Sequence, residues 1–306
     1  RGTFGISLFA VGLLRPFPLG GILASLPSTV PAYAVLDRTN APGAVGEPLY
    51  LEVVAAIIEQ MDADTPPFAV APRIIGGRYG LSSKEMTPAM IKPIFEELAA
   101  DRPKRHFTVG IYDDVTHLSL PIDADFHAPR PAGEVQALFY GLGSDGTVGA
   151  NKASVKIIGE GTDLYAQGYF VYDSKKSGSM TVSHLRFGPA PIRSTYLVEQ
   201  ADFVACHQFG LLDRTKVLEH AKPGATFLLN SPYGPDEVWE QLSRDIQQQL
   251  VDKAIDFWVI DAFAVDEEVG MGNRINTIMQ RCFFHLAAVL QPEDAVTRIK
   301  GTVQGS

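Results

Sequence analysis

The sequence predicts an α/β protein with two α/β domains, the second a doubly wound, mostly parallel sheet with a glycine-rich βα loop. Three observations predict this class. Short apolar runs alternate with longer amphipathic segments along most of the chain. The chain has 306 residues, about the length of two ordinary domains. A proline-containing stretch with little periodicity, residues 121–133, separates residues 1–120 from residues 134–306 and is expected to be a linker.

The first domain, residues 1–120, is expected to alternate short strands with helices. Apolar residues recur on one face of Pro48–Met61, which indicates a helix. Thr87 followed by Pro88 is typical of a helix start, and Pro93 is expected to kink or shorten that helix. The other expected elements are strands at Phe4–Leu14, Ala32–Leu36 and Phe107–Ile111, and helices at Leu19–Leu26 and Ala89–Ala99.

The second domain, residues 134–306, shows the same alternation more clearly. Strands that are separated by single helices imply a mostly parallel sheet, whose ligands bind beyond the carboxyl ends of the strands. The expected strands are Gln136–Tyr140, Leu164–Tyr172, Phe203–Cys206, Thr226–Leu229 and Phe257–Ile260. The expected helices are Ala150–Ile158, Asp213–Ala221, Pro235–Lys253 and Arg274–Leu290.

A glycine-rich segment between the first strand and the first helix of this domain indicates an anion site. Gly141, Gly143 and Gly146 satisfy the G-x-G-x-x-G spacing of dinucleotide-binding loops. Backbone N–H groups at a helix start bind phosphate-like anions. The next strand ends near two lysines, Lys175 and Lys176, which suit a ligand with several phosphates. An NAD-type site, an ordinary tight turn and a solvated lysine turn all remain open at this point.

Two further loops contain polar candidates. In the segment from Gly270 to Asn276, Asn273 is a reasonable helix N-cap. Arg274 and Asn276 could face a ligand at the helix end. Cys206 and His207 are adjacent, so their side chains lie on opposite faces of a strand. A nucleophile–base pair is therefore disfavoured, and we interpret them as a buried thiol beside a histidine at a strand end.

Composition excludes several classes of protein. The net charge of −9 argues against a nucleic-acid partner. Two cysteines supply neither a disulfide framework nor the four ligands of an iron–sulfur cluster, and a reducing, cytoplasmic setting is expected. The apolar run near the start is shorter than the about 20 residues that a membrane span requires, so it is expected to be a buried strand and not a membrane anchor.

Several segments together resemble the pyruvate:ferredoxin (or flavodoxin) oxidoreductases, a family of 2-oxoacid oxidoreductases. The resemblance extends over nearly the whole chain and is far more specific than any single motif. It depends on residues 36–50, 78–84, 141–152, 172–178, 183–187 and 229–232. It implies that residues 1–120 are most of a transketolase-C-terminal-like domain and that residues 134–306 are a gamma-type domain.

The resemblance also implies a ligand, coenzyme A, which is a substrate of this family. It assigns no catalytic residue and no metal ligand to this chain. The residues that it places at coenzyme A are Gly143, Ser144, Asp145, Gly146, Thr147, Lys175 and Asn276. Lys175 is expected to pair with the phosphates, and Asn276 to hydrogen-bond the ligand from the second loop.

The complete enzyme implied by the resemblance is a homodimer that makes acetyl-CoA and CO2 from pyruvate and coenzyme A. It uses thiamine diphosphate and [4Fe-4S] clusters held by domains that these residues do not include, and it passes electrons to ferredoxin or flavodoxin. The chain alone is expected to be inactive. The alternatives left open by the residues are an NAD(P)-dependent dehydrogenase domain and a purely structural module.

Overall fold

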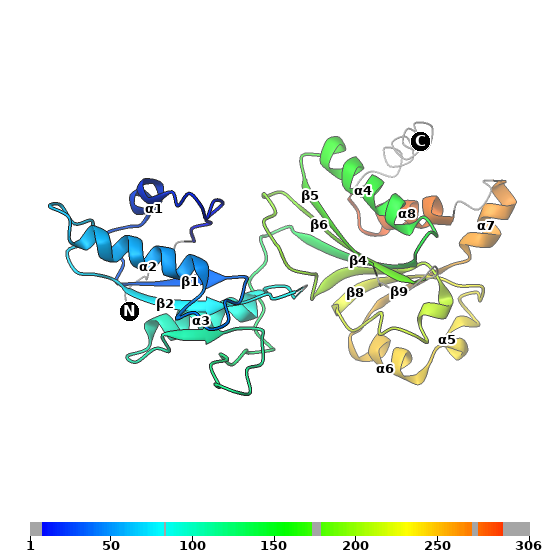
Figure 1. Ribbon diagram of the computed structural model, residues 1–306. Helices are drawn as coiled ribbons and strands as arrows, with labels where there is room; N and C mark the ends of the chain where they lie inside the picture. The colour runs from blue at the N-terminus through cyan, green and yellow to red at the C-terminus, as the bar shows by residue number, and fades with distance from the viewer. Residues whose placement is uncertain (1–7, 83, 173–178, 271–274, 290–306) are drawn as a thin grey trace. The chain divides into compact units, whose positions relative to one another are not determined.

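The computed structural model describes residues 8–82, 84–172, 179–270 and 275–289 (Figure 1). The chain divides into two compact units, Arg1–Ala128 and Pro129–Ser306. Each unit has its own sheet and its own apolar core. No helix among the described residues is long and apolar enough to cross a membrane.

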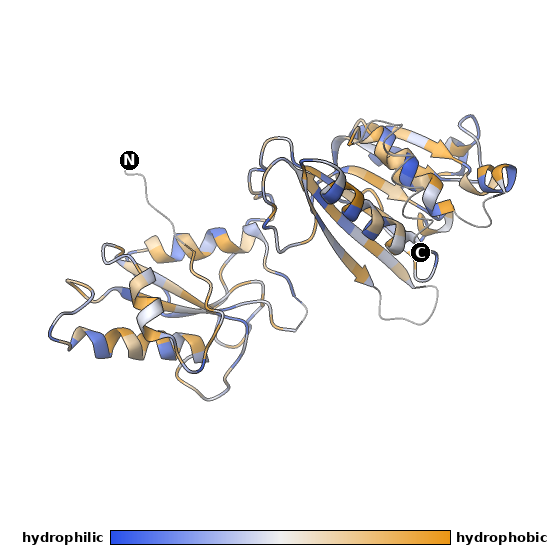
Figure 2. Cartoon of the chain, turned by 90° about the horizontal axis from the view of Figure 1, so that it is seen from above, coloured by the Kyte–Doolittle hydropathy of each residue, from blue (hydrophilic) through white to orange (hydrophobic). Residues whose placement is uncertain are grey.

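The first unit is a three-stranded parallel sheet with helices on both faces. Its strands lie in the order β1 (Ala32–Asp37), β2 (Arg73–Arg78) and β3 (His106–Thr108). The helices α1 (Leu19–Ser25) and α2 (Pro48–Met61) pack with one core cluster, and α3 (Pro88–Ala99) packs with another on the opposite face. Figure 2 shows that the helices carry both hydrophobic and hydrophilic residues, as expected for helices that pack one face on a sheet and expose the other to solvent.

Several predictions for the first unit are confirmed and others are wrong. The helix at Pro48–Met61 has the predicted bounds. The strand expected at Phe4–Leu14 is absent from its described part, residues 8–14, because this run does not enter the core: Leu8 is 93% exposed. Pro93 does not shorten the helix, since α3 continues through this buried residue to Ala99. The strand β2 was missed because Gly76 and Gly77 weaken its strand pattern.

The second unit is a six-stranded, mostly parallel sheet in the order β5-β6-β4-β7-β8-β9. The strand β6 is antiparallel to both of its neighbours, and all other neighbouring pairs are parallel. The strands are β4 (Val135–Leu142), β5 (Tyr165–Tyr172), β6 (Met180–Gly188), β7 (Ala201–Cys206), β8 (Ala221–Asn230) and β9 (Asp256–Ile260).

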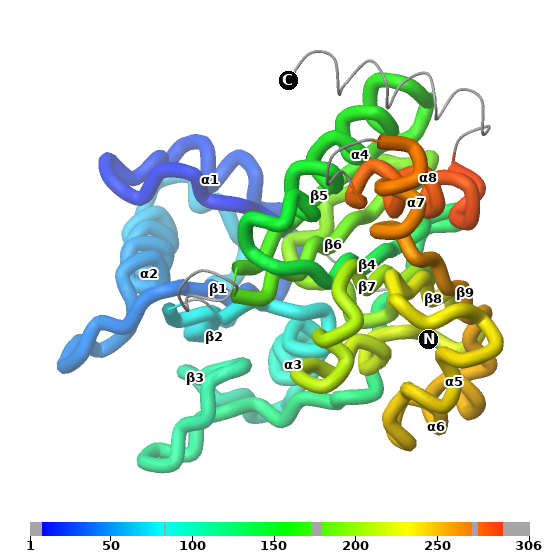
Figure 3. Tube along the Cα trace, turned by 90° about the vertical axis from the view of Figure 1, so that its right-hand side faces the viewer, coloured from blue at the N-terminus to red at the C-terminus, as the bar shows by residue number. Residues whose placement is uncertain are grey.

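Helices cover both faces of this sheet, as a doubly wound fold requires (Figures 1 and 3). One face packs with α4 (Thr147–Gly161), α7 (Ala262–Val269) and α8 (Ile275–Leu286). The other face packs with α5 (Val238–Gln241) and α6 (Arg244–Asp252). The glycine loop, where the sequence predicted a ligand site, connects the end of β4 to the start of α4.

The differences from the predicted elements of the second unit have physical causes. The helix expected at Asp213–Ala221 is wrong: a short 3-10 helix, Phe209–Leu211, is followed by turns up to β8. The helix expected at Pro235–Lys253 divides at Ser243, whose hydroxyl accepts the N–H of Ile246 and so caps α6. The strand β6 and the helix α7 were missed.

Strand β6 was missed because it buries polar side chains on both faces of the sheet. His184 is one of these side chains, and its Nδ1 accepts the N–H of Val198 at 3.1 Å. The ring is therefore neutral, with its proton on Nε2. Burial, together with the charge of Arg186 and with His220, lowers the pKa of His184 to about 4.

We expect His184 to make the fold sensitive to acid. Below pH 6.5 the unfolded chain binds a proton at this ring while the folded chain does not, so stability falls from pH 6.5 to about 4. At 1.36 kcal/mol per pKa unit the loss is about 3 kcal/mol. His184→Asn keeps an acceptor near Nδ1 and does not titrate. Urea unfolding at both pH values should show a smaller acid loss for this variant, and equal losses would contradict the assignment.

Phe283 is the centre of the aromatic core between α8 and the sheet. Its ring contacts those of Phe139, Phe187, Phe203 and Phe284, with centroids 5.0–6.0 Å apart. It is fully buried. The position at which α8 lies on the sheet therefore depends on this side chain.

Replacing Phe283 with alanine should lower the free energy of unfolding by about 3–5 kcal/mol, because the cavity cannot collapse between a helix and a sheet. Phe263 of α7 is the matched control, since it is 51% exposed. Phe263→Ala should change stability by less than about 1 kcal/mol. Denaturant unfolding of both variants compares them, and similar losses would show that α8 is loosely packed.

Candidate functional site: the glycine loop and its partners

The glycine loop connects β4 to α4 and is closed by the side chain of Asp145. One carboxylate oxygen accepts the N–H of Leu142 at 2.7 Å and the other accepts the N–H of Thr147 at 2.8 Å. The N–H of Gly143 donates to the carbonyl of Ser179, which precedes β6, at 2.6 Å. Both oxygens of the Asp145 carboxylate therefore bind backbone N–H groups of the loop and stabilise its conformation.

Glycine is required at two points of this loop. Gly146 is the N-cap of α4 and has φ +88°, which disfavours any residue with a Cβ. A Cβ at Gly146 would lie 2.8 Å from Nδ2 of Asn276. A Cβ at Gly141 would overlap the side chain of Thr147. The absence of a Cβ at these two positions therefore allows the loop to pack closely against Thr147 and Asn276.

Asn276, in the first turn of α8, hydrogen-bonds the glycine loop. Its Nδ2 donates to the carbonyl of Asp145. Its Oδ1 accepts from the hydroxyl of Thr147 at 3.2 Å and lies 2.7 Å from Nδ1 of His207. One turn later, Nε2 of Gln280 donates to the carbonyl of Ala150 and the hydroxyl of Ser154. A polar seam therefore joins α8 to the start of α4.

The structure brings most of the predicted site residues together. Gly143, Asp145 and Thr147 belong to one hydrogen-bonded loop, and Asn276 reaches it from a segment 129 positions away from Thr147. Ser144 and Gly146 are exposed, whereas Thr147 and Asn276 are buried. The predictions for Lys175, Lys176, Asn273 and Arg274 lie outside the described residues.

The flanks of residues 173–178 are described, and they lie beside the loop. Tyr172 at the end of β5 pairs with Thr181 of β6, and Thr181 pairs with Gly141 of β4. Ser179 is hydrogen-bonded to Gly143. The segment that contains Lys175 follows Tyr172 in the sequence and ends before Ser179.

His207 is a site residue that the sequence analysis missed. It follows β7, the neighbour of β4, and its ring joins Thr147 and Asn276 in one buried group. The interpretation of Cys206 as a buried thiol on the opposite face is confirmed, and burial raises its pKa to about 12. The available signal was the position of His207 at the carboxyl end of a central strand.

The strand order differs from that of a dinucleotide-binding fold. In that fold the second strand lies next to the first, so that an acidic residue at its end meets the ribose. Here the antiparallel β6 separates β5 from β4. Tyr172, the last described residue of β5, is therefore two strands away from β4. The G-x-G-x-x-G spacing occurs without the topology that an NAD site uses.

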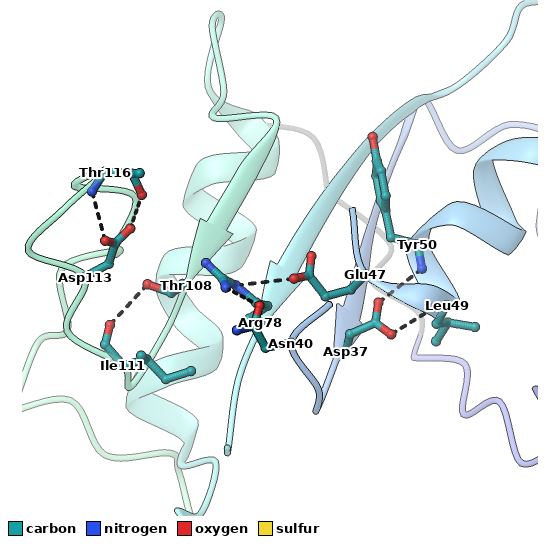
Figure 4. Close-up of polar contacts among 10 residues, drawn as sticks. All are labelled: Asp37, Asn40, Glu47, Leu49, Tyr50, Arg78, Thr108, Ile111, Asp113 and Thr116. Atoms are coloured by element: carbon teal, nitrogen blue, oxygen red, sulfur yellow. Dashed lines mark hydrogen bonds and ion pairs between the residues drawn. The ribbon is translucent and has the colours of Figure 1, made fainter. Parts of the chain in front are cut away.

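Polar groups at the carboxyl edge of the first unit's sheet are paired with one another (Figure 4). Both oxygens of Asp37 accept N–H groups at the start of α2, from Leu49 at 2.9 Å and Tyr50 at 3.1 Å. Nε of Arg78 lies 3.5 Å from Oε1 of Glu47, and Nη1 of Arg78 donates to Oδ1 of Asn40 at 2.8 Å. These residues of segments 36–50 and 78–84 stabilise the loops of this unit.

Nearby, hydrogen bonds from Thr116 hold the pKa of Asp113 well below its usual range. Across the described residues of the chain, no group of histidine, cysteine, aspartate and glutamate side chains has the geometry of a metal site.

Comparison with known proteins supports the resemblance. The family model of pyruvate ferredoxin/flavodoxin oxidoreductase matches residues 136–306. A pyruvate-flavodoxin oxidoreductase of Nostoc is 57% identical over 98% of this chain and 25% of its own length. The chain belongs to the pyruvate ferredoxin/flavodoxin oxidoreductase family. It spans about a quarter of the length of the curated relatives that it matches.

Relatives from other lineages match to a similar extent. A pyruvate:ferredoxin oxidoreductase of Moorella thermoacetica is 49% identical over 97% of this chain and 25% of its own length. Among solved structures, pyruvate oxidoreductase subunit PORC of Thermotoga maritima is similar with a TM-score of 0.44 and 16% identity, over 56% of this chain and 85% of that chain.

Replacing two glycines of the same segment with alanine should change the stability of the protein in opposite directions. Gly146→Ala should lower the free energy of unfolding by about 1–3 kcal/mol, because it forces a Cβ into positive φ and towards Asn276. Gly149, inside α4, has open space around its Cβ position. Gly149→Ala should raise stability by about 0.5–1 kcal/mol. Thermal unfolding checks both changes, and a neutral Gly146→Ala would contradict the loop geometry.

Proposed function

We propose that this chain is the central part of a pyruvate:ferredoxin/flavodoxin oxidoreductase and that its second unit supplies part of the coenzyme A site. One observation carries the proposal: the glycine loop, Asn276 and the flanks of the Lys175 segment meet at the carboxyl end of β4. Family membership supports the reaction class. The topology disfavours the dehydrogenase alternative.

The loop has the features of a phosphate site. The exposed Ser144 and Gly146 lie at the N-terminal end of α4, a helix of 15 residues whose positive end favours anions. Lys175 would add a cation for the phosphates of coenzyme A. The carboxamide oxygen of Asn276 is already used twice, so this residue would offer the ligand its second Nδ2 hydrogen. The Asp145 carboxylate would shape the loop instead of meeting the ligand.

The complete enzyme would convert pyruvate and coenzyme A to acetyl-CoA and CO2, and would pass electrons to ferredoxin or flavodoxin. The described residues do not fit a [4Fe-4S] cluster. A [4Fe-4S] cluster needs four thiolates, whereas Cys206 is buried in the core with a raised pKa and Cys282 lies on α8. The clusters would therefore be held by the remaining domains, and we propose the same for thiamine diphosphate. We infer that this chain binds coenzyme A and does not act on pyruvate by itself.

The first unit would be most of the transketolase-C-terminal-like domain of this enzyme, which we propose to be a homodimer. Its polar loop residues are paired internally, so a scaffold role fits it best. Calorimetry with the full-length oxidoreductase compares the two nucleotide ligands directly. Binding of coenzyme A without NADH supports the proposal, and the reverse result would restore the dehydrogenase alternative. Binding of neither would favour a purely structural module.

Lys175 provides the sharpest test of the coenzyme A site. In the full-length oxidoreductase, Lys175→Ala should weaken coenzyme A binding by about 1.5–3 kcal/mol, typical of a lost charge-assisted hydrogen bond. Decarboxylation of pyruvate before acetyl transfer should be nearly unchanged. Lys176→Ala is the matched control of equal charge change. A KM for coenzyme A that is unchanged in Lys175→Ala, or equally raised in both variants, would remove Lys175 from the site.

A further inference from the structure

His207 lies where three elements of the second unit meet, and its backbone fixes the position of its ring. Its N–H donates to the carbonyl of Tyr140 in β4 at 2.9 Å. Its carbonyl accepts from Nδ2 of Asn230, at the end of β8, at 3.0 Å. The residue is only 2% exposed. The imidazole is therefore held from both neighbouring strands and directed at the base of the glycine loop.

The contacts of Asn276 determine which ring nitrogen of His207 carries the proton. Nδ2 of Asn276 donates to the carbonyl of Asp145, so Oδ1 is the atom that lies 2.7 Å from Nδ1 of His207. A carboxamide oxygen only accepts hydrogen bonds, so Nδ1 must be protonated. The hydroxyl of Thr147, 3.2 Å from the same Nδ1, donates to the same oxygen.

The other nitrogen of the ring supports the neutral form. Nε2 is buried and has no hydrogen-bond partner among the described residues. The ring also contacts that of Phe139 edge-on, with centroids 6.3 Å apart. A second proton would place a buried N–H in apolar surroundings. Burial accordingly lowers the pKa of His207, against the opposing effects of the Asn276 hydrogen bond and the Asp145 charge.

We propose that His207, neutral and protonated at Nδ1, is a positioning residue for the coenzyme A site. By donating to Oδ1 it fixes the orientation of the Asn276 carboxamide, whose Nδ2 in turn holds the carbonyl of Asp145 beside Gly146. Without this donor the amide loses its preferred orientation, and the loop around Gly146 is free to populate other shapes. The apparent affinity of a ligand then falls with the fraction of competent loops. The inference depends on the proposed function for its ligand.

Three substitutions in the full-length oxidoreductase separate positioning from simple packing. His207→Asn places an amide nitrogen near the position of Nδ1, His207→Gln places one near Nε2, and His207→Phe retains a ring without donors. The Gln and Phe variants should raise the KM for coenzyme A about tenfold, equivalent to about 1.4 kcal/mol. Their kcat at saturating coenzyme A and their KM for pyruvate should not change. His207→Asn should restore the normal KM.

Hydrogen exchange without coenzyme A gives a second, activity-independent measurement. Peptides covering residues 142–150 and 275–280 should exchange faster in His207→Gln and His207→Phe, and at the normal rate in His207→Asn. Normal exchange and a normal KM in a folded His207→Phe or His207→Gln would overturn the inference, as would an Asn variant that behaves like Phe. If exchange follows the expected pattern but Lys175→Ala leaves the KM unchanged, only the assignment of the ligand fails.

Discussion

The hydrogen bonds of the Asn276 carboxamide are the interactions on which the candidate site of the second unit depends. Its two polar atoms join the loop after β4, the residue after β7 and the first turn of α8. These partners are far apart in the sequence, so no local preference brings them together. In a buried setting each of these hydrogen bonds is directional and costly to lose. The shape of the glycine loop is thus determined by tertiary contacts as well as by its glycines.

The loop itself could be predicted from the sequence because its determinants are local. The apolar strand, the closely spaced glycines and the helix start that follows them each predict a tight βα turn at this position. The helix nevertheless begins at Thr147, three residues earlier than expected, because Asp145 accepts the N–H of Thr147 and Gly146 supplies the N-cap. The sequence predicted that Asn276 could face a ligand at a helix end. Its contact with the loop could not be predicted locally, since 129 positions separate it from Thr147.

Other features could not be predicted because they depend on strand order. The strand β6 has no apolar alternation, and the segment after it supplies partners for two of its buried polar side chains: Arg186 donates to the carbonyl of Leu197, and His184 accepts from Val198. His207 gains its role only when β7 lies beside β4. A residue next to a buried cysteine gives no local sign of this.

Strand order also distinguishes this glycine loop from that of a dinucleotide-binding fold. In a dinucleotide-binding fold the strand beside the loop ends in an acid that recognises a ribose. Here that neighbouring position is occupied by β6, which runs the other way, so the connection from β5 begins and ends beside the loop. The segment between β5 and β6, whose two flanks lie beside the loop, contains Asp173, Lys175 and Lys176. Under the proposed function, the lysines of this segment would take the place that an acidic residue has in a dinucleotide-binding fold, which suits a ligand rich in phosphate.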